Sequence, residues 1–155
     1  KGITASEWLN TSSLKEMTDI FTEYGEESKS YSIASAIVYT REKKHDIETT
    51  KDLVDIIKTV LKNDINYKKT LGRIFQAIRI HINNELNEVK LGINDAKELL
   101  KQHGVLAVIT FHSIEDRIVK NIFKDEINEL ILPSAEEIKN NPKAKNAKLR
   151  YMIKC

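Results

Sequence analysis

A single change in hydrophobic period constrains the fold of this chain more than any other feature of its 155 residues. Up to Gly104 the apolar residues recur at helical spacing, and residues 105–111 then form a continuous apolar run. A run of this kind after a helix predicts a parallel strand that is buried on both faces. Residues 114–124 return to helical spacing, and the order helix, strand, helix is typical of an open α/β sheet.

One buried parallel strand cannot form a sheet by itself, and the rest of the sequence offers it few neighbours. Residues 148–154 predict a second strand, whereas the short stretch between Phe123 and Pro133 predicts none. We therefore expect a mainly α chain with a partial α/β end, in which an all-helical module precedes the final part of an α/β domain. Because the chain begins with Lys1 and lacks the first half of such a domain, we expect it to be a segment of a longer protein.

The helical module is expected to contain helices with recognisable starts and ends. Ser13 and Glu16 have the spacing of a capping box, and Gly25 is suited to end the helix that follows. Further helices are expected at about 26–43, after a capping signature at 49–52, and at about 71–101 with a break at Gly92.

Composition excludes several classes of protein and of site. Cys155 is the only cysteine, which excludes a disulfide framework or a cysteine-based zinc cluster and favours the reducing cytoplasm as the location. The four histidines lack the spacing of a metal motif, so we expect no metal, and no two of the five glycines suit a nucleotide-binding loop. No apolar run is long enough for a membrane span. With a net charge of +2, any nucleic-acid surface must be a local patch.

Polar side chains gather on one side of the long helical stretch. At about 100° per residue, that side consists of Lys69, Arg73, Gln76, Arg79, Asn83 and Asn87. Most polar stripes are solvated faces, and the pattern alone favours this interpretation. The alternative is RNA binding, because Arg, Gln and Asn suit contacts with phosphates and base edges.

The densest group of polar side chains, the strand-end group, follows the predicted buried strand. It consists of His112, Ser113, Glu115 and Asp116, at the end of a strand where open α/β sheets place ligands and catalytic groups. A serine hydrolase is excluded, because adjacent strand residues point to opposite faces and the G-x-S-x-G motif is missing. Ser113 is expected to cap a helix that begins near Ile114.

The tail of the chain is locally basic. Residues 139–154 contain six Lys or Arg side chains and no acidic residue. Lys148 and Arg150 are therefore further candidates for contact with RNA phosphates, and the alternative is a solvated lysine-rich tail.

Five blocks of sequence, in order, resemble the RsmH (MraW) family of S-adenosylmethionine-dependent methyltransferases of small-subunit ribosomal RNA. The longest uninterrupted block is the family pattern SFHSLEDRIVK, which residues 110–120 match with two conservative changes. The other blocks are AxEWLN at 5–10, YGEE with IARAIV at 24–27 and 33–38, TFQAxRIxxNxEL at 74–86, and NPRxRSxKLR at 141–150. Together the blocks extend over nearly the whole chain.

The resemblance implies a Rossmann-like methyltransferase domain that a helical insertion interrupts. In these terms residues 1–88 are the helical, substrate-recognition insertion, and residues 89–155 are the C-terminal part of the methyltransferase domain. The implied activity is methyl transfer from S-adenosylmethionine to N4 of a cytosine in the decoding region of small-subunit rRNA. Because the family's glycine-rich cofactor loop lies upstream, no cofactor-binding residue is assigned to this chain, and the chain alone is expected to be inactive.

With this activity, each candidate group has an expected role. The residues expected near the substrate are His112, Ser113, Glu115 and Asp116, and those expected to contact RNA are Arg73, Gln76, Arg79 and Asn83, with Lys148 and Arg150 as weaker candidates. The expected partner is small-subunit rRNA or the ribosomal subunit, not DNA or a membrane, and a homodimer stays open. The alternative function is a non-catalytic helical module that binds RNA or protein, and a third is a catalytically dead paralogue.

Overall fold

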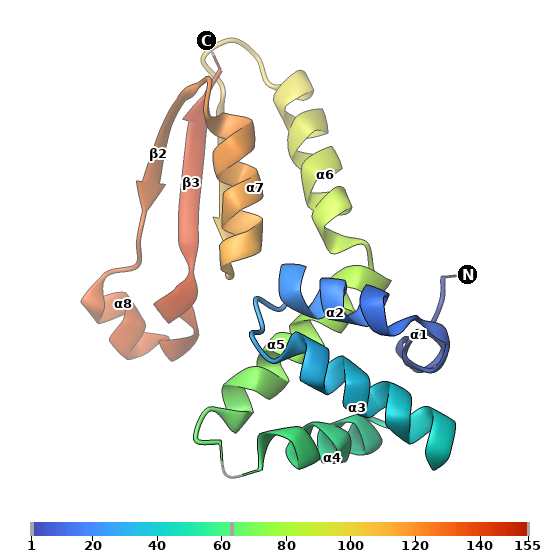
Figure 1. Ribbon diagram of the computed structural model, residues 1–155. Coiled ribbons are helices and arrows are strands. Elements are labelled where there is room, and N and C mark those ends of the chain that lie inside the picture. The colour runs from blue at the N-terminus through green and yellow to red at the C-terminus, as the bar shows by residue number, and fades with distance from the viewer. Residues whose placement is uncertain (1, 63, 155) are drawn as a thin grey trace. The chain divides into compact units, whose positions relative to one another are not determined.

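The computed structural model describes residues 2–62 and 64–154, which divide into two compact units (Figure 1). The first, the helical unit, extends to Glu85, and the second, the α/β unit, begins at Leu86. This division lies close to the predicted boundary at residue 88. Each unit has its own hydrophobic core and is described separately.

The helical unit is built from helices whose starts are encoded locally. They are α1 (Ala5–Thr11), α2 (Leu14–Glu23), α3 (Ser30–Lys43), α4 (Thr50–Leu61) and α5 (Tyr67–Ile82). The predicted capping signature before α4 is confirmed, because Thr49 and Asp52 cap one another's backbone N–H groups. At α2 only half of the predicted box forms. Ser13 accepts from the backbone N–H of Glu16, but the Glu16 carboxylate accepts instead from Nε1 of Trp8 at 2.8 Å.

The apolar stripes of these helices pack into one core. Its fully buried members include Met17, Phe21, Ile33, Ile37, Ile57 and Ile74. Since these side chains come from α2, α3, α4 and α5, the core fixes the four helices to one another. In the part of the chain that the structure describes, no helix is both long enough and apolar enough to cross a membrane.

Gly25 lies between α2 and α3, but it does not end α2 through a left-handed conformation. Glu26 adopts that conformation instead, with a φ of 48°, and the next helix starts at Ser30 rather than at the predicted residue 26. A methyl group on Gly25 would lie 2.6 Å from the carbonyl oxygen of Phe21 and 3.0 Å from that of Arg73. Glycine is therefore required here by close packing of the α2–α3 turn against α5.

The predicted long helix after residue 71 is in fact two helices. α5 begins earlier, at Tyr67, and α6 (Glu85–Leu99) follows it after a turn in which Asn84 has a φ of 52°. The predicted break at Gly92 is wrong, because Gly92 lies within α6 with no atom close to the position of its absent Cβ. Asparagine tolerates the left-handed conformation better than most residues, which explains why the turn forms where it does.

The α/β unit combines a three-stranded sheet with helices. After α6 come β1 (Val105–Thr110), α7 (Ser113–Phe123), β2 (Ile127–Ile131), α8 (Ala135–Asn140), a 3₁₀ turn (Pro142–Asn146) and β3 (Lys148–Ile153). The strand order is β1-β3-β2, and β3 is antiparallel to both neighbours. β1 and β2 therefore run parallel to each other, joined through α7, with the last strand inserted between them (Figure 1).

Two predictions for this unit are wrong. β1 is not a parallel strand buried on both faces: it pairs antiparallel with β3, and its residues alternate between exposed and partly or fully buried. β2 forms in the stretch for which no strand was predicted. Its sequence, Ile-Asn-Glu-Leu-Ile, is short and two of its five residues are polar, so hydrophobic periodicity does not distinguish it from a loop.

Only one face of this sheet is covered by the described residues. Phe123 and Val119 of α7 pack with Met152 of β3 and Ile93 of α6 in a small core. On the other face Val105, Ile109, Ile127 and Ile131 are each more than half exposed. The α/β unit therefore has an open apolar face.

Candidate functional site

The strand-end group lies where β1 leads into α7. His112 is the N-cap of α7: its backbone is extended, and its ring Nδ1 accepts a 3.3 Å hydrogen bond from the backbone N–H of Glu115. The prediction that Ser113 caps this helix is wrong by one residue, because Ser113 is already the first helical residue. A ring nitrogen without a proton accepts from a helix N–H as a serine hydroxyl does.

His112 and Glu115 form a local pair at this corner. Nε2 of His112 lies 3.1 Å from Oε1 of Glu115, but the two groups are not aligned for a hydrogen bond, so their contact is electrostatic. The other carboxylate oxygen of Glu115 accepts from the backbone N–H of Phe111 at 3.0 Å. The pair thus fastens the end of β1 to the first turn of α7.

Asp116, the last member of the group, is buried and faces β3. Its carboxylate accepts a hydrogen bond of 2.7 Å from Nε of Arg150 and one of 2.9 Å from Nζ of Lys148. The hydrogen bond from Arg150 is the main reason that the pKa of Asp116 lies below its ordinary value, and Lys148 lowers it further. These three side chains, the Asp116 triad, connect α7 to β3.

The triad was not predicted from the sequence. Lys148 and Arg150 were expected to contact RNA, but both are paired with Asp116, and only 11% of the Arg150 side chain is exposed. One signal for it does exist, because Lys148 and Arg150 are two residues apart and so lie on the same face of β3, the face that α7 covers. This geometry gives Asp116 and Arg150 a structural role.

The predicted polar stripe holds only in part, because its helix ends at the C-cap Asn83: Lys69, Arg73, Gln76 and Arg79 lie on α5, whereas Asn87 lies on α6. Gln76 donates from Nε2 to the carbonyl oxygen of Tyr24 at 3.1 Å, and Arg79 donates from Nε to Glu85 at 2.9 Å. Asn83 contacts the same Glu85 carboxylate at 3.3 Å. Each of these stripe residues therefore has a partner within the helical unit, and 57% of the Arg79 side chain still faces solvent.

Arg73, one turn before Gln76, is held in a different way. Its Nη1 lies 3.5 Å from a carboxylate oxygen of Glu27, which is almost completely buried, while 49% of the Arg73 side chain is exposed. The α5 face thus presents two arginines, Arg73 and Arg79, each tethered at one side by a carboxylate and open on the other. Guanidinium groups in this arrangement suit contacts with phosphate oxygens.

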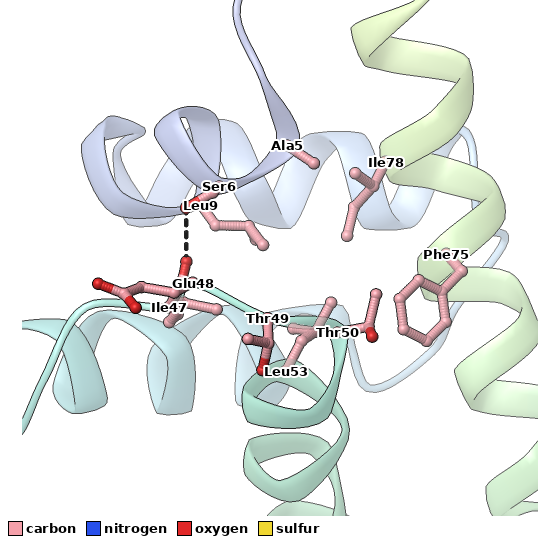
Figure 2. Close-up of a pocket in the computed structure, with 10 residues that line it drawn as sticks. All are labelled: Ala5, Ser6, Leu9, Ile47, Glu48, Thr49, Thr50, Leu53, Phe75 and Ile78. Carbon is pink, nitrogen blue, oxygen red and sulfur yellow. Dashed lines mark hydrogen bonds between the residues drawn. The ribbon is translucent and has the colours of Figure 1, made fainter.

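Sequence analysis missed a small apolar pocket of about 170 Å³ in the helical unit (Figure 2). Its lining comes from α1, from the segment before α4, and from the first turn of α4 and the middle of α5: Ala5, Ser6, Leu9, Ile47, Glu48, Thr49, Thr50, Leu53, Phe75 and Ile78. Ser6 closes one side by donating from its hydroxyl to the carbonyl oxygen of Ile47 at 2.7 Å. The lining is mostly apolar, which suits an aliphatic or aromatic group and not acid–base chemistry.

Metal binding has no support in the described residues. Among residues 2–62 and 64–154, no three His, Cys, Asp or Glu side chains form a group that could hold a metal ion.

The sequence profile of the MraW methylase family matches residues 1–130, which is most of the chain. The chain therefore belongs to the MraW methylase family. Its ordered resemblance to that family, inferred above from five blocks, is confirmed.

Several curated proteins that share one name are also similar to the chain. Ribosomal RNA small subunit methyltransferase H of Persephonella marina (strain DSM 14350 / EX-H1) is 43% identical over 158 residues, covering 95% of this chain and 54% of the relative. The protein of the same name from Ehrlichia canis (strain Jake) is 43% identical over 169 residues, covering 98% and 57%. The corresponding protein of Buchnera aphidicola subsp. Cinara cedri (strain Cc) is 43% identical over 155 residues, covering 99% and 50%. The chain thus spans about half the length of the curated relatives it matches.

Proposed function

We propose that this chain is the C-terminal, RNA-recognising half of an S-adenosylmethionine-dependent methyltransferase. The proposed reaction methylates N4 of a cytosine in the decoding region of small-subunit rRNA. The observation that carries this proposal is the 43% identity to relatives named ribosomal RNA small subunit methyltransferase H over almost the entire chain. The family match over residues 1–130 supports the same class of enzyme.

The described residues do not form a cradle for S-adenosylmethionine. The strand-end carboxylates are already engaged, Glu115 by Phe111 and Asp116 by the two cations of the triad. Most of the cofactor's site belongs, in this proposal, to the half of the relatives that the chain does not span, and the open apolar sheet face is where that half packs.

The α5 face is the proposed RNA contact. Arg73 and Arg79 bind phosphates, and Gln76 and Asn83 supply further polar contacts beside them. Lys148 is a weaker candidate, and Arg150 acts there only through the Asp116 triad. The small net charge of the chain is compatible with this proposal, because a few phosphate contacts need only a local group of cations.

The strand-end group has two proposed roles. His112 and Glu115, together with the neighbouring Ser113, line the side of the site to which the target base is brought. Asp116 keeps α7 in place on β3 and so holds that turn in position. The target base must leave its stack to be methylated, and the exocyclic amine, whose lone pair is delocalised into the ring, must be held in line for transfer.

A non-catalytic binding module is the second candidate function. It is favoured by one observation, namely that the helical unit has a complete core and a mostly apolar pocket of its own. In that case the pocket, and not the strand-end group, is the functional site.

The two functions are separated by measurements on the 155-residue chain. It is incubated with a small-subunit rRNA fragment that contains the decoding region and with radiolabelled S-adenosylmethionine, and an unrelated RNA of equal length serves as the control. We expect preferential binding of the rRNA fragment without methyl incorporation, and no cofactor binding in a calorimetric titration. Equal affinity for both RNAs argues for a general binding module, whereas methyl incorporation contradicts the placement of the cofactor site outside the chain.

A further inference from the structure

The turn between α2 and α3 is docked tightly onto α5. Gly25 approaches the backbone of Arg73 so closely that a methyl group there would lie 3.0 Å from the Arg73 carbonyl oxygen. One turn later, Gln76 donates a hydrogen bond to the carbonyl oxygen of Tyr24. Two contacts from the same turn, at Gly25 and at Tyr24, therefore hold the α5 segment 73–76 in place.

Glu27, at the end of this turn, is a buried carboxylate with only one oxygen satisfied. Oε1 accepts from the backbone N–H of Lys29 at 3.0 Å, but Oε2 is buried and has no hydrogen-bond donor in the part of the chain that the structure describes. Burial of a charged group without good partners is expensive. The hydrogen bond from Lys29 does not by itself require this charge, because a neutral amide oxygen accepts from a backbone N–H as well.

The missing partner of Glu27 is Arg73. Its Nη1 lies 3.5 Å from Oε2, close enough for attraction but longer than a good hydrogen bond. Within residues 2–62 and 64–154, the Arg73 guanidinium has no other partner, and half of the side chain faces solvent. One edge of the guanidinium thus faces a buried anion, and its remaining N–H donors are available to a ligand.

We propose that Glu27 is a positioning residue, which orients the Arg73 guanidinium to bind an RNA phosphate. This inference rests on the proposed RNA-binding function and names the residue that prepares one of its contacts. A free arginine loses rotamer freedom when it binds, and prior orientation by a buried carboxylate removes part of that loss. In the proposed complex the RNA phosphate forms a second ion pair with the Arg73 guanidinium, on the side opposite Glu27.

The substitution Glu27→Gln tests this proposal by the sign of its effect. It removes a negative charge near an anionic ligand, so electrostatics alone predicts tighter RNA binding. Loss of orientation predicts weaker binding, by about threefold. The Gln oxygen can still accept from the Lys29 N–H, so the start of α3 is preserved. The probe is a fluorescently labelled single-stranded RNA of the decoding-region sequence, titrated with the 155-residue chain by anisotropy.

Glu23→Gln is the matched control. This substitution also removes one negative charge, but at an exposed position at the end of α2. It is expected to leave affinity unchanged or slightly higher. Arg73→Ala is expected to weaken binding about tenfold and to reduce the slope of log affinity against log salt by about one. In the double variant, Glu27→Gln is expected to add nothing to Arg73→Ala, because the residue acts only through the arginine.

Arg73→Lys keeps the proposal falsifiable if Glu27→Gln fails to fold. It preserves the charge but not the planar fork, so we expect a severalfold loss of affinity, whereas a purely electrostatic contact predicts no change. Unchanged or tighter binding by a folded Glu27→Gln chain overturns the inference and leaves the proposed function intact. Failure of the unsubstituted chain to bind the RNA overturns both.

Discussion

The two units of this chain differ in how much of their apolar surface they bury. The helical unit folds its stripes inward, so that residues such as Phe21 and Ile33 are fully buried. The α/β unit buries Phe123 and Met152 on one face of its sheet but leaves Val105 and Ile127 about 60% exposed on the other. The first unit therefore buries its apolar stripes within itself, whereas the second has a surface suited to a further layer.

The largest loss of stability among the substitutions that test this difference is expected at Asp116. With a small, one-sided core, the α/β unit depends on the Asp116 triad, and Asp116→Asn leaves Arg150 buried without an anion. Breaking a buried ion pair in this way typically destabilises by about 3 kcal/mol or more. Urea unfolding monitored by hydrogen exchange should show the loss in β1, β3 and α7. The control Asp125→Asn, at an exposed position in the same unit, should change little, and equal stability of the two variants would contradict a stabilising triad.

A smaller loss is expected in the helical unit for Gly25→Ala. Its methyl group would meet the carbonyl oxygen of Phe21 at 2.6 Å, so the α2–α3 turn must move away from α5. Overpacking of this kind destabilises by about 2 kcal/mol. Gly72→Ala is the control, because that glycine lies within α5 with open space around it and should gain up to about 1 kcal/mol of helix stability. A gain of stability at both positions would show that the turn is not closely packed.

The openness of the sheet predicts a difference in local stability between the units. Amide protons of β2, which is an edge strand with exposed side chains, should exchange at least tenfold faster than those in the middle of α2. The measurement is native-state hydrogen exchange of the 155-residue chain. Similar protection in both elements would mean that another molecule, or a second copy of the chain, covers the open face in solution.

Acid should affect the α/β unit through Asp116. Because the folded-state pKa of Asp116 is lowered, the unfolded chain binds a proton more readily, and stability rises with pH in this range. The contribution is complete above the ordinary pKa of 3.8 and is lost as the pH falls through the lowered folded value. In the Asp116→Asn variant this part of the pH dependence should be absent. The measurement is thermal unfolding of the unsubstituted chain and of the variant between pH 2 and pH 5. An unchanged acid profile in the variant would assign the acid sensitivity to other carboxylates.

The smallest effect on stability is expected for Arg79→Ala. Arg79 is more than half exposed, and its ion pair with Glu85 is a surface pair, so the loss should stay below about 1 kcal/mol. Affinity for decoding-region RNA should nevertheless fall about tenfold if the α5 face binds phosphates. If instead Arg79→Ala unfolds the helical unit and leaves affinity intact, the residue is structural.

Local signals in the sequence predicted much of this architecture. The capping residues Thr49 and Asp52, and the change of period at Gly104, marked real boundaries because each depends on neighbours in the chain. The break between α5 and α6 was misplaced to Gly92, because the competing signal at Asn84 is a single left-handed residue. His112 was overlooked as a cap because serine is the commoner choice.

Long-range pairings were not predictable in the same way. Asp116 and Arg150 meet only because β3 lies beside β1 under α7, and nothing local in either segment encodes the contact. The same holds for Glu27 and Arg73, whose encounter depends on the docking of the α2–α3 turn. The sequence therefore shows where polar residues gather, but their partners became known only from the fold.

The position of β3 also has a consequence for synthesis of the chain. Of the three described strands β3 is synthesised last, yet it pairs with both β1 and β2, so none of these strands can pair in its final register before β3 emerges. The helical unit ends at Glu85, and at about 5–20 residues per second it is available several seconds earlier. A nascent chain therefore has time to form its helical core while the apolar residues of β1 are still unpaired. During that interval the unpaired apolar residues of β1 are prone to aggregation, which is the kind of exposure that chaperones counter.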